Sequence, residues 1–216
     1  MKRFPDGSEG EFHYFFCQRE AIETFVYLRE QRGIVRLSRL IDEFGGPDSR
    51  ETALGVTEDD DKLPRYAFKI ATGAGKTKVM SLAIAWSYFQ ALRETDSPMA
   101  KSFVIIAPNL TVYERLKDDF AGGNIFEEDP VIPPEWKGDF SMSVVLQDGA
   151  GGGVSSSGGV IYLTNIHRLY DPDKRGNANG EHYGFMPFDI SRTRALRDSS
   201  EVVLRATLAE SRSPTA

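Results

Sequence analysis

The residue run best suited to chemistry is Thr72-Gly73-Ala74-Gly75-Lys76-Thr77, a glycine-rich turn that ends in a lysine and a threonine. Gly73 and Gly75 have no Cβ, so the backbone can pass close around an anion. Peptide N–H groups and the start of a following helix supply partial positive charge for phosphates. In such a loop Lys76 reaches the β- and γ-phosphates, and the Thr77 hydroxyl binds Mg²⁺. The spacing therefore predicts a site for ATP and Mg²⁺.

The general form of this motif is G-x-x-x-x-G-K-[ST], and Ile70 stands where its first glycine should be. The alternative is a chance glycine-rich turn in front of a core helix. The flanking residues favour phosphate binding. Residues 66–70 alternate in the manner of a short strand, and residues 79–92 are apolar almost all round, as in a buried helix. The sequence thus predicts strand, phosphate loop and helix.

The elements that position this loop alternate between strands and helices. Continuous apolar runs suit parallel strands that are covered on both faces. Such runs occupy residues 102–107 and 159–163, and residues 141–146 are expected to form another short strand. Tyr113, Leu116 and Phe120 form a helical stripe after the first run. We therefore expect an α/β fold, with a parallel sheet flanked by helices.

Polar residues follow two of these predicted strands. Thr111 and Glu114 come after the first strand and have the spacing of a capping box, so a helix cap is the simplest role for Thr111. Thr164 and Asn165 end the last strand, at the edge of the sheet where ligands bind in α/β proteins.

Two further segments have predictable roles. Residues 17–28 have the pattern of a helix whose buried face contains Ala21, Ile22, Phe25 and Leu28. Residues 124–140 contain three prolines, which exclude regular structure through the middle of this segment. Trp136 in this segment either anchors a long loop on the domain or stacks on a base.

Composition narrows the function classes. The formal net charge is -6, so no global basic field attracts the chain to nucleic acid, and any such contact must be local. The one cysteine, Cys17, permits no intrachain disulfide and fits a reducing cytoplasm; we expect it to be buried at a helix start. The N-terminus lacks the apolar stretch of a signal peptide, and no run of about 18 apolar residues predicts a membrane span.

Taken together, these runs resemble the N-terminal part of the DEAD/DEAH-box (superfamily-two) helicase family that includes the Res subunits of type III restriction enzymes. The resemblance covers roughly residues 12–171 and is most specific at T-G-A-G-K-T, the form that the phosphate loop takes in these helicases. Its other segments are FFCQREAIETFVYL, VIIAPNLTVYERL, IFEEDPVIPPEWKGDF and GVIYLTNIHRLYD. The resemblance implies an incomplete RecA-like first helicase domain, ATP hydrolysis with Mg²⁺, and movement on DNA or its unwinding.

The resemblance also assigns binding residues. It implies that Gln18 reads adenine, since a side-chain amide can donate and accept at once; the alternative is an ordinary polar residue in the first turn of a helix. Nucleotide phosphates would be bound by residues 72–77, and Mg²⁺ by Thr77. The nucleic-acid backbone would be bound by Pro108, Asn109, Thr111, Thr164 and Asn165, through contacts that are independent of base sequence.

The sequence departs from this family in one important respect. No D-E-x-H or D-E-x-D box follows Tyr170, and the second RecA-like domain with its arginine finger is missing. We therefore assign no catalytic residue. Asp171 and Asp173 follow a tyrosine instead of a buried strand, so they are poor substitutes for the box. The expected partners are DNA and either the missing C-terminal helicase domain or a modification subunit.

Three hypotheses about the function remain open. The chain is the ATP-binding portion of a restriction-type helicase, a nucleotide-binding remnant without turnover, or a P-loop NTPase of another kind. We expect an N-terminal helical extension over residues 1–63, a partial RecA-like ATP-binding domain over residues 64–188, and an irregular tail over residues 189–216. One strand-like run, Val202 to Leu204, interrupts that tail.

Overall fold

The computed structural model describes residues 2–3, 9–46, 49, 61, 64, 66–128, 130–147, 158–169 and 202–205. The chain forms two compact units, one of residues His13–Val79 and the other of Met1–Phe12 with Met80–Ala216. Helix α5, Lys76–Arg93, begins in the first unit and continues into the second. The division into segments 1–63, 64–188 and 189–216 stays a prediction.

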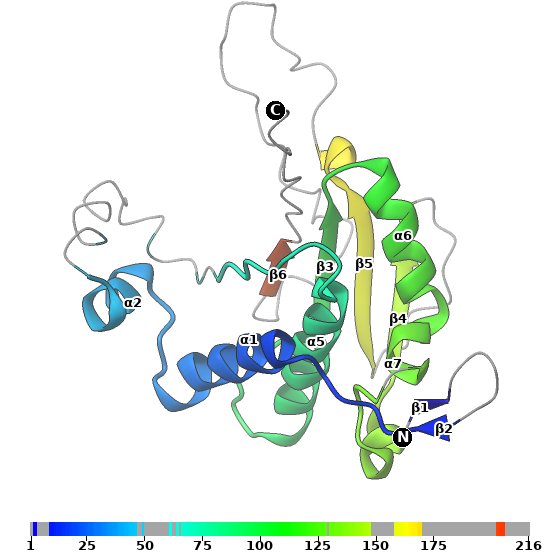
Figure 1. Ribbon diagram of the computed structural model, residues 1–216, viewed down its shortest axis with the longest axis horizontal. Helices are drawn as coiled ribbons and strands as arrows, with labels where there is room; N and C mark the ends of the chain where they lie inside the picture. Colours follow the sequence, from blue (N-terminus) through cyan, green and yellow to red (C-terminus); the bar gives the residue numbers. More distant parts are fainter. Residues whose placement is uncertain are drawn as a thin grey trace, which may run out of the picture. The chain divides into compact units, whose positions relative to one another are not determined.

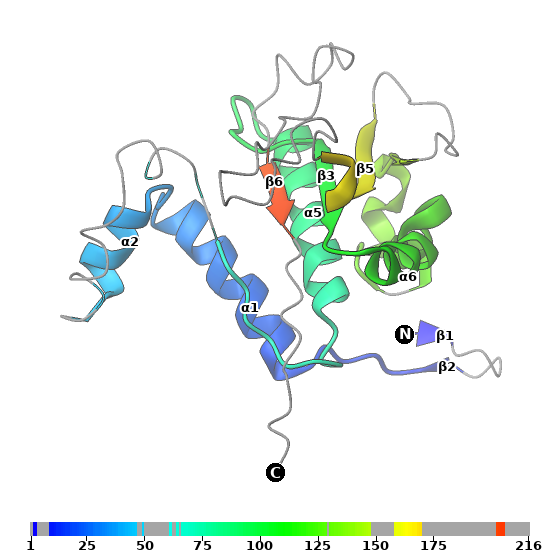
Figure 2. The ribbon, with the colours of Figure 1, turned by 90° about the horizontal axis from the view of Figure 1, so that it is seen from above.

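The larger unit contains a four-stranded sheet in the order β4-β5-β3-β6, in which every pairing is parallel (Figure 1). The strands are β3 (Ser102–Ala107), β4 (Met142–Leu146), β5 (Gly159–Asn165) and β6 (Val202–Arg205). Strand β6 lies beside β3 in both views (Figure 2). The predicted strands of this unit are confirmed, including the short run in the tail.

One face of the sheet carries the hydrophobic core. Phe103 of β3 lies level with Ile161 of β5, and both side chains are fully buried. They pack with side chains from α5, from α6 (Leu110–Phe120) and from α7 (Asn124–Glu128). The predicted stripe of α6 is buried in this core. The α/β fold with a parallel sheet flanked by helices is therefore confirmed, as an incomplete RecA-like domain.

The segment 124–140 is more regular than its prolines suggested. Helix α7 occupies its start, and a 3-10 helix, η3, spans Pro134–Asp139. Proline fits the first turn of a helix because its missing N–H has no partner there, and Pro134 begins η3. Our expectation of irregular structure holds only for the described residues 130–133 between the two helices.

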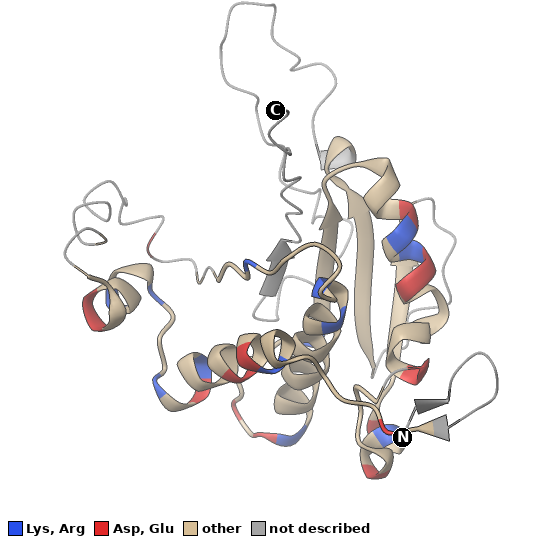
Figure 3. Ribbon diagram, in the orientation of Figure 1, with Lys and Arg blue, Asp and Glu red and all other residues tan. Residues whose placement is uncertain are grey.

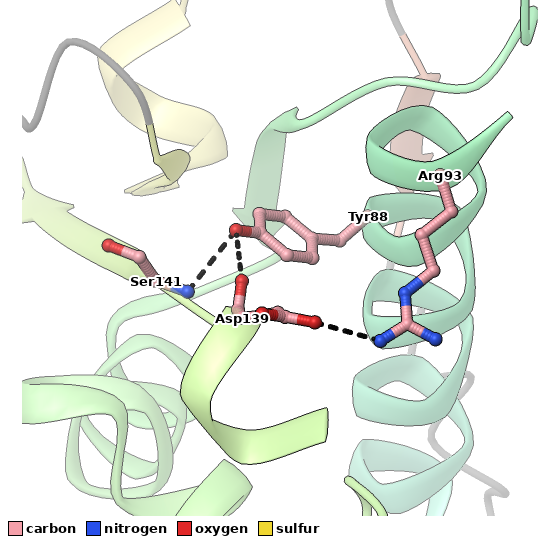
Figure 4. Close-up of polar contacts among 4 residues, drawn as sticks. All are labelled: Tyr88, Arg93, Asp139 and Ser141. Carbon is pink, nitrogen blue, oxygen red and sulfur yellow. Dashed lines mark hydrogen bonds and ion pairs between the residues drawn. The ribbon is translucent and has the colours of Figure 1, made fainter. Parts of the chain in front are cut away.

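Hydrogen bonds and an ion pair connect η3 to the C-terminal part of α5 (Figure 4). The buried Tyr88 hydroxyl donates to the Asp139 carbonyl at 3.0 Å and accepts from the Ser141 N–H at 3.2 Å. Arg93 binds the Asp139 carboxylate at 2.9 Å, and its guanidinium lies 4.0 Å from the centre of the Trp136 ring. Trp136 therefore anchors this segment, which was the first of its two predicted roles.

We expect Tyr88→Phe to lower the free energy of unfolding by about 1–2 kcal/mol, because two backbone groups lose their hydroxyl partner. Tyr162→Phe is the matched control, since Tyr162 is half-buried in β5 and alternates to the opposite face from Ile161 and Leu163. Urea unfolding of both variants measures the difference. Equal midpoints for the two variants would show that the Tyr88 hydroxyl does not hold η3.

The smaller unit contains α1 (Phe16–Val26), a π-helical turn η1 (Tyr27–Gln31) and α2 (Leu37–Phe44). Phe25 of α1 is buried as predicted, whereas Cys17 is exposed, so its expected burial was wrong. Asp61 accepts hydrogen bonds from the Ser38 N–H at 2.8 Å and hydroxyl at 2.7 Å, in the first turn of α2. These bonds hold the pKa of the Asp61 carboxyl below its usual value.

The predicted strand before the phosphate loop is not present: the described residues 66–71 have no strand structure. Their aromatic side chains pack instead on α1, with Tyr66 and Phe68 edge-on to Phe25 at centroid distances of 4.9 and 5.6 Å. The Tyr66 hydroxyl also donates to the Ile34 carbonyl. A strand requires a neighbouring strand for its backbone hydrogen bonds, and the alternation of side chains alone does not supply one.

Short elements complete the described part of the chain. A two-stranded antiparallel ribbon pairs β1 (Lys2–Arg3) with β2 (Glu9–Gly10). The 3-10 turns η2 (Ala121–Gly123) and η4 (Ile166–Leu169) follow α6 and β5. None of the helices in the described residues has the length and apolar character needed to cross a membrane.

Candidate functional site

The phosphate loop has the backbone conformation that its glycines permit. Gly73 has a φ of 81° and Gly75 a φ of 78°, in the left-handed region that other residues rarely adopt. A Cβ built at Gly73 would meet nothing within 4 Å, so this part of the loop is open. Lys76 is the first residue of α5, so the loop leads directly into the N-terminus of an 18-residue helix.

The Lys76 ammonium lies over the beginning of its own loop. Its Nζ donates to the carbonyl of Ile70 at 2.8 Å and to that of Ala71 at 3.0 Å. Both acceptors are neutral, whereas a phosphate offers a full negative charge and a stronger hydrogen bond. The ammonium is therefore held inside the loop, and it can donate its hydrogen bonds to an anion that enters the loop instead of to these carbonyls.

Gln18 is joined to this loop from a distant point of the sequence. Its side chain is 2% exposed, and its Nε2 donates to the Ala74 carbonyl at 2.9 Å across 56 residues. Its Oε1 accepts from the Phe15 N–H at 3.0 Å, which caps the start of α1. Each end of the amide keeps capacity for one further hydrogen bond, as contact with adenine requires.

The residues present fit a magnesium nucleotide. The open backbone at Gly73, the Lys76 ammonium and the start of α5 match the charge and size of a polyphosphate. Thr77, in the first turn of α5 and half-buried, is the residue that would ligate Mg²⁺. Bound Mg²⁺ would neutralise phosphate charge. The sequence has no D-E-x-H or D-E-x-D box after Tyr170 that would add a carboxylate ligand.

Helix α6 is capped by Asn109 and not by Thr111. The Asn109 side chain accepts from the Val112 N–H at 2.9 Å, so Asn109 is the N-cap of α6. Thr111 is exposed within the helix. The expected capping box of Thr111 and Glu114 was therefore wrong, because Asn109 already occupies the cap two positions earlier. Pro108 is half-buried between β3 and this cap.

We expect Asn109→Ala to lower the free energy of unfolding by about 1 kcal/mol, because the Val112 N–H loses its partner at the helix start. Thr111→Ala in the same turn is the control and should change stability by less than about 0.5 kcal/mol, as exposed substitutions do. Thermal or urea unfolding compares the two. A larger loss for Thr111→Ala would restore the predicted capping box.

Thr164 and Asn165 are 4% and 3% exposed at the end of β5. The Gln147 Oε1 accepts from the Asn165 N–H at 3.1 Å and from its Nδ2 at 2.9 Å. The Asn165 Oδ1 accepts from the His167 N–H at 2.9 Å. This network fixes the carboxyl end of β5 against the residue that follows β4. Sequence reasoning missed Gln147, although a polar residue directly after an apolar strand could have identified it.

The register of the sheet brings the strand ends together. Ala107 of β3 is level with Asn165 of β5, so Pro108 and Asn109 leave the sheet beside the end of β5. Gln18 and residues 72–77 form a second group, in the smaller unit. The predicted site residues are therefore gathered in two groups, one in each compact unit.

Residues of both charge signs occur along the described helices. Both α1 and α6 carry basic and acidic residues together (Figure 3). On α1, Arg19 pairs with Glu23 at 3.1 Å, and both side chains are exposed. A nucleic-acid contact would therefore depend on local groups, as the net charge of -6 predicts. Asp171 and Asp173 lie outside the described residues.

Comparison with protein families gives a match that covers most of the chain. A family model described as "Type III restriction enzyme, res subunit" matches residues 11–191. No curated protein and no solved structure gives a match. The matched range includes Gln18, the phosphate loop and both strand ends, and it ends before β6.

Proposed function

The chain belongs to the type III restriction enzyme res subunit family, whose members carry a helicase-like ATP-binding domain, and from this premise we propose that it binds MgATP through residues 72–77. Within this proposal Gln18 contacts adenine, Lys76 contacts the β- and γ-phosphates, and Thr77 contacts Mg²⁺. The chain would act as the ATP-binding portion of an ATP-dependent DNA helicase or translocase.

One observation carries this proposal. The Lys76 ammonium is held inside the glycine loop by the Ile70 and Ala71 carbonyls, at the start of α5. A phosphate that enters the loop would offer this ammonium a stronger, charged acceptor than the two neutral carbonyls. The left-handed glycines on either side of Ala74 give the same loop the open backbone that a polyphosphate needs.

Equilibrium titration of the purified chain with ATP tests the proposal, once with Mg²⁺ and once with excess EDTA. We expect saturable binding with Mg²⁺ and weaker binding without it, because the metal bridges the phosphates and neutralises their charge. Saturation that is absent under both conditions would rule out the proposed nucleotide site.

DNA is the proposed partner, through the backbone contacts of Pro108, Asn109, Thr111, Thr164 and Asn165. Because Asn109 caps α6 and Asn165 is buried in a network, the groups best able to reach a phosphate are backbone N–H groups and the exposed Thr111 hydroxyl. Fluorescence anisotropy with single-stranded and duplex DNA should detect weak binding that is independent of sequence and weakens with salt. Tight binding that is sequence-specific and insensitive to salt would contradict this part of the proposal.

A second candidate is a nucleotide-binding module with no turnover of its own. The absence of a D-E-x-H or D-E-x-D box after Tyr170 in the sequence favours it over a complete enzyme. Both candidates share the MgATP site, so the rate of phosphate release separates them.

A further inference from the structure

We propose that Gln18 is a positioning residue for the phosphate loop itself, so that binding of any polyphosphate depends on it, whatever the base. The inference rests on the proposed nucleotide site and deepens it. A residue that only reads adenine would affect ATP alone. A residue that shapes the loop would affect every ligand that the loop binds.

The Gln18 amide is anchored at both ends. Its Oε1 is fixed by the Phe15 N–H at the start of α1, and its Nε2 is fixed to the Ala74 carbonyl. At 2% exposure the side chain has little room to adopt another rotamer. Gln18 therefore connects the N-terminus of α1 to the middle of the phosphate loop.

This connection determines the direction of a loop N–H group. The Ala74 carbonyl and the Gly75 N–H belong to one planar trans peptide, in which they point in opposite directions. Because Gln18 fixes the carbonyl from one end of this peptide, the Gly75 N–H points the opposite way within the same plane. Loop N–H groups are the donors that bind phosphate oxygens. The Gln18 side chain thus orients a phosphate-binding group without contacting the phosphate.

Gly75 shows how closely the two residues fit. A Cβ built on Gly75 would fall on the Gln18 Nε2, far inside contact distance. Gly75 also has a φ of 78°, which disfavours any side chain. Gly75→Ala would therefore displace the Gln18 amide from its two hydrogen bonds. The effects of substitutions at Gly75 and Gln18 on binding should then not be independent of each other.

The first test measures the affinities of MgATP, MgGTP and magnesium tripolyphosphate for the parent and for Gln18→Ala. Gln31→Ala, an exposed glutamine in the same unit, is the matched control. We expect Gln18→Ala to weaken MgGTP and magnesium tripolyphosphate by a similar factor of about 5- to 20-fold, the effect of one or two lost hydrogen bonds. MgATP should be weakened by at least that factor, because it also loses the proposed contact between Gln18 and adenine. Gln31→Ala should match the parent.

A double-mutant cycle separates loop positioning from a general loss of structure. If Gly75→Ala already displaces Gln18, then adding Gln18→Ala should weaken tripolyphosphate binding by less than about twofold more. If the losses of affinity in the two single variants multiply in the double variant, the two positions act independently, and this would overturn the proposal. So would a loss in Gln18→Ala that is confined to ATP, with tripolyphosphate binding unchanged. A parent that binds none of the three ligands would instead contradict the proposed nucleotide site itself.

Discussion

The purified chain is expected to release phosphate from MgATP about 10³- to 10⁵-fold more slowly than a complete helicase of this family, the range that an arginine finger alone contributes in related NTPases. Three sets of groups stabilise the transferred phosphoryl group in such enzymes: the loop lysine with Mg²⁺, the acidic box, and an arginine from the second domain. The sequence supplies the first set at Lys76 and Thr77, and no acidic box follows Tyr170. Because no group of this kind orients the attacking water, we expect bound ATP to be hydrolysed slowly.

Steady-state phosphate release, measured with and without DNA, tests this expectation. Arg168, Arg192 and Arg194 are available in the sequence, but each would need a partner surface to hold it against the phosphates. Lys76→Ala serves as the background control, because any residual signal that it retains comes from a contaminant. Turnover that is stimulated by DNA and disappears in Lys76→Ala would show that the carboxylates are supplied by residues we have not identified.

The second large effect concerns the core of the sheet. We expect Phe103→Ala to lower the free energy of unfolding by about 3–5 kcal/mol, because the ring is fully buried in β3, a strand with partners on both sides, and its removal leaves a cavity. Phe44→Ala is the matched control, since Phe44 is 56% exposed at the end of α2. Its loss should be less than about 1 kcal/mol.

Urea unfolding followed by circular dichroism compares these two variants. Where Phe103→Ala fails to fold, Phe103→Leu keeps most of the apolar volume and should show an intermediate loss. Similar losses for Phe103→Ala and Phe44→Ala would contradict the assignment of β3 to the centre of the core.

Strands β3 and β5 were predictable because each contains an apolar run. Residues 102–107 and 159–163 have no other favourable place than a layer covered on both faces, so pattern alone identified β3 and β5. The run 66–70 shows where this reasoning fails. Its aromatic residues alternate as in a strand, but they pack on Phe25 of α1, and this long-range contact leaves no trace in local periodicity.

The site residues were predictable as types, and their contacts were not. The glycines, lysine and threonine of the loop have a spacing with a known physical purpose, and a helix does begin at Lys76 as predicted. The cap of α6 was assigned to Thr111, but it is Asn109, because several neighbouring polar residues can cap one helix. The bond from Gln18 to Ala74 joins residues 56 positions apart, and only the fold makes it visible.

The measurement that tests the central claim most directly is equilibrium binding of MgATP to three proteins: the parent, Lys76→Ala and Lys69→Ala. Lys69 is an exposed lysine just before the loop, so its substitution removes the same charge outside the proposed site. We predict that Lys69→Ala binds like the parent and that Lys76→Ala binds about 100-fold more weakly, the loss expected for charge-assisted hydrogen bonds to phosphate. Circular dichroism should show the same fold in all three proteins. Equal affinity of Lys76→Ala and the parent would contradict the account.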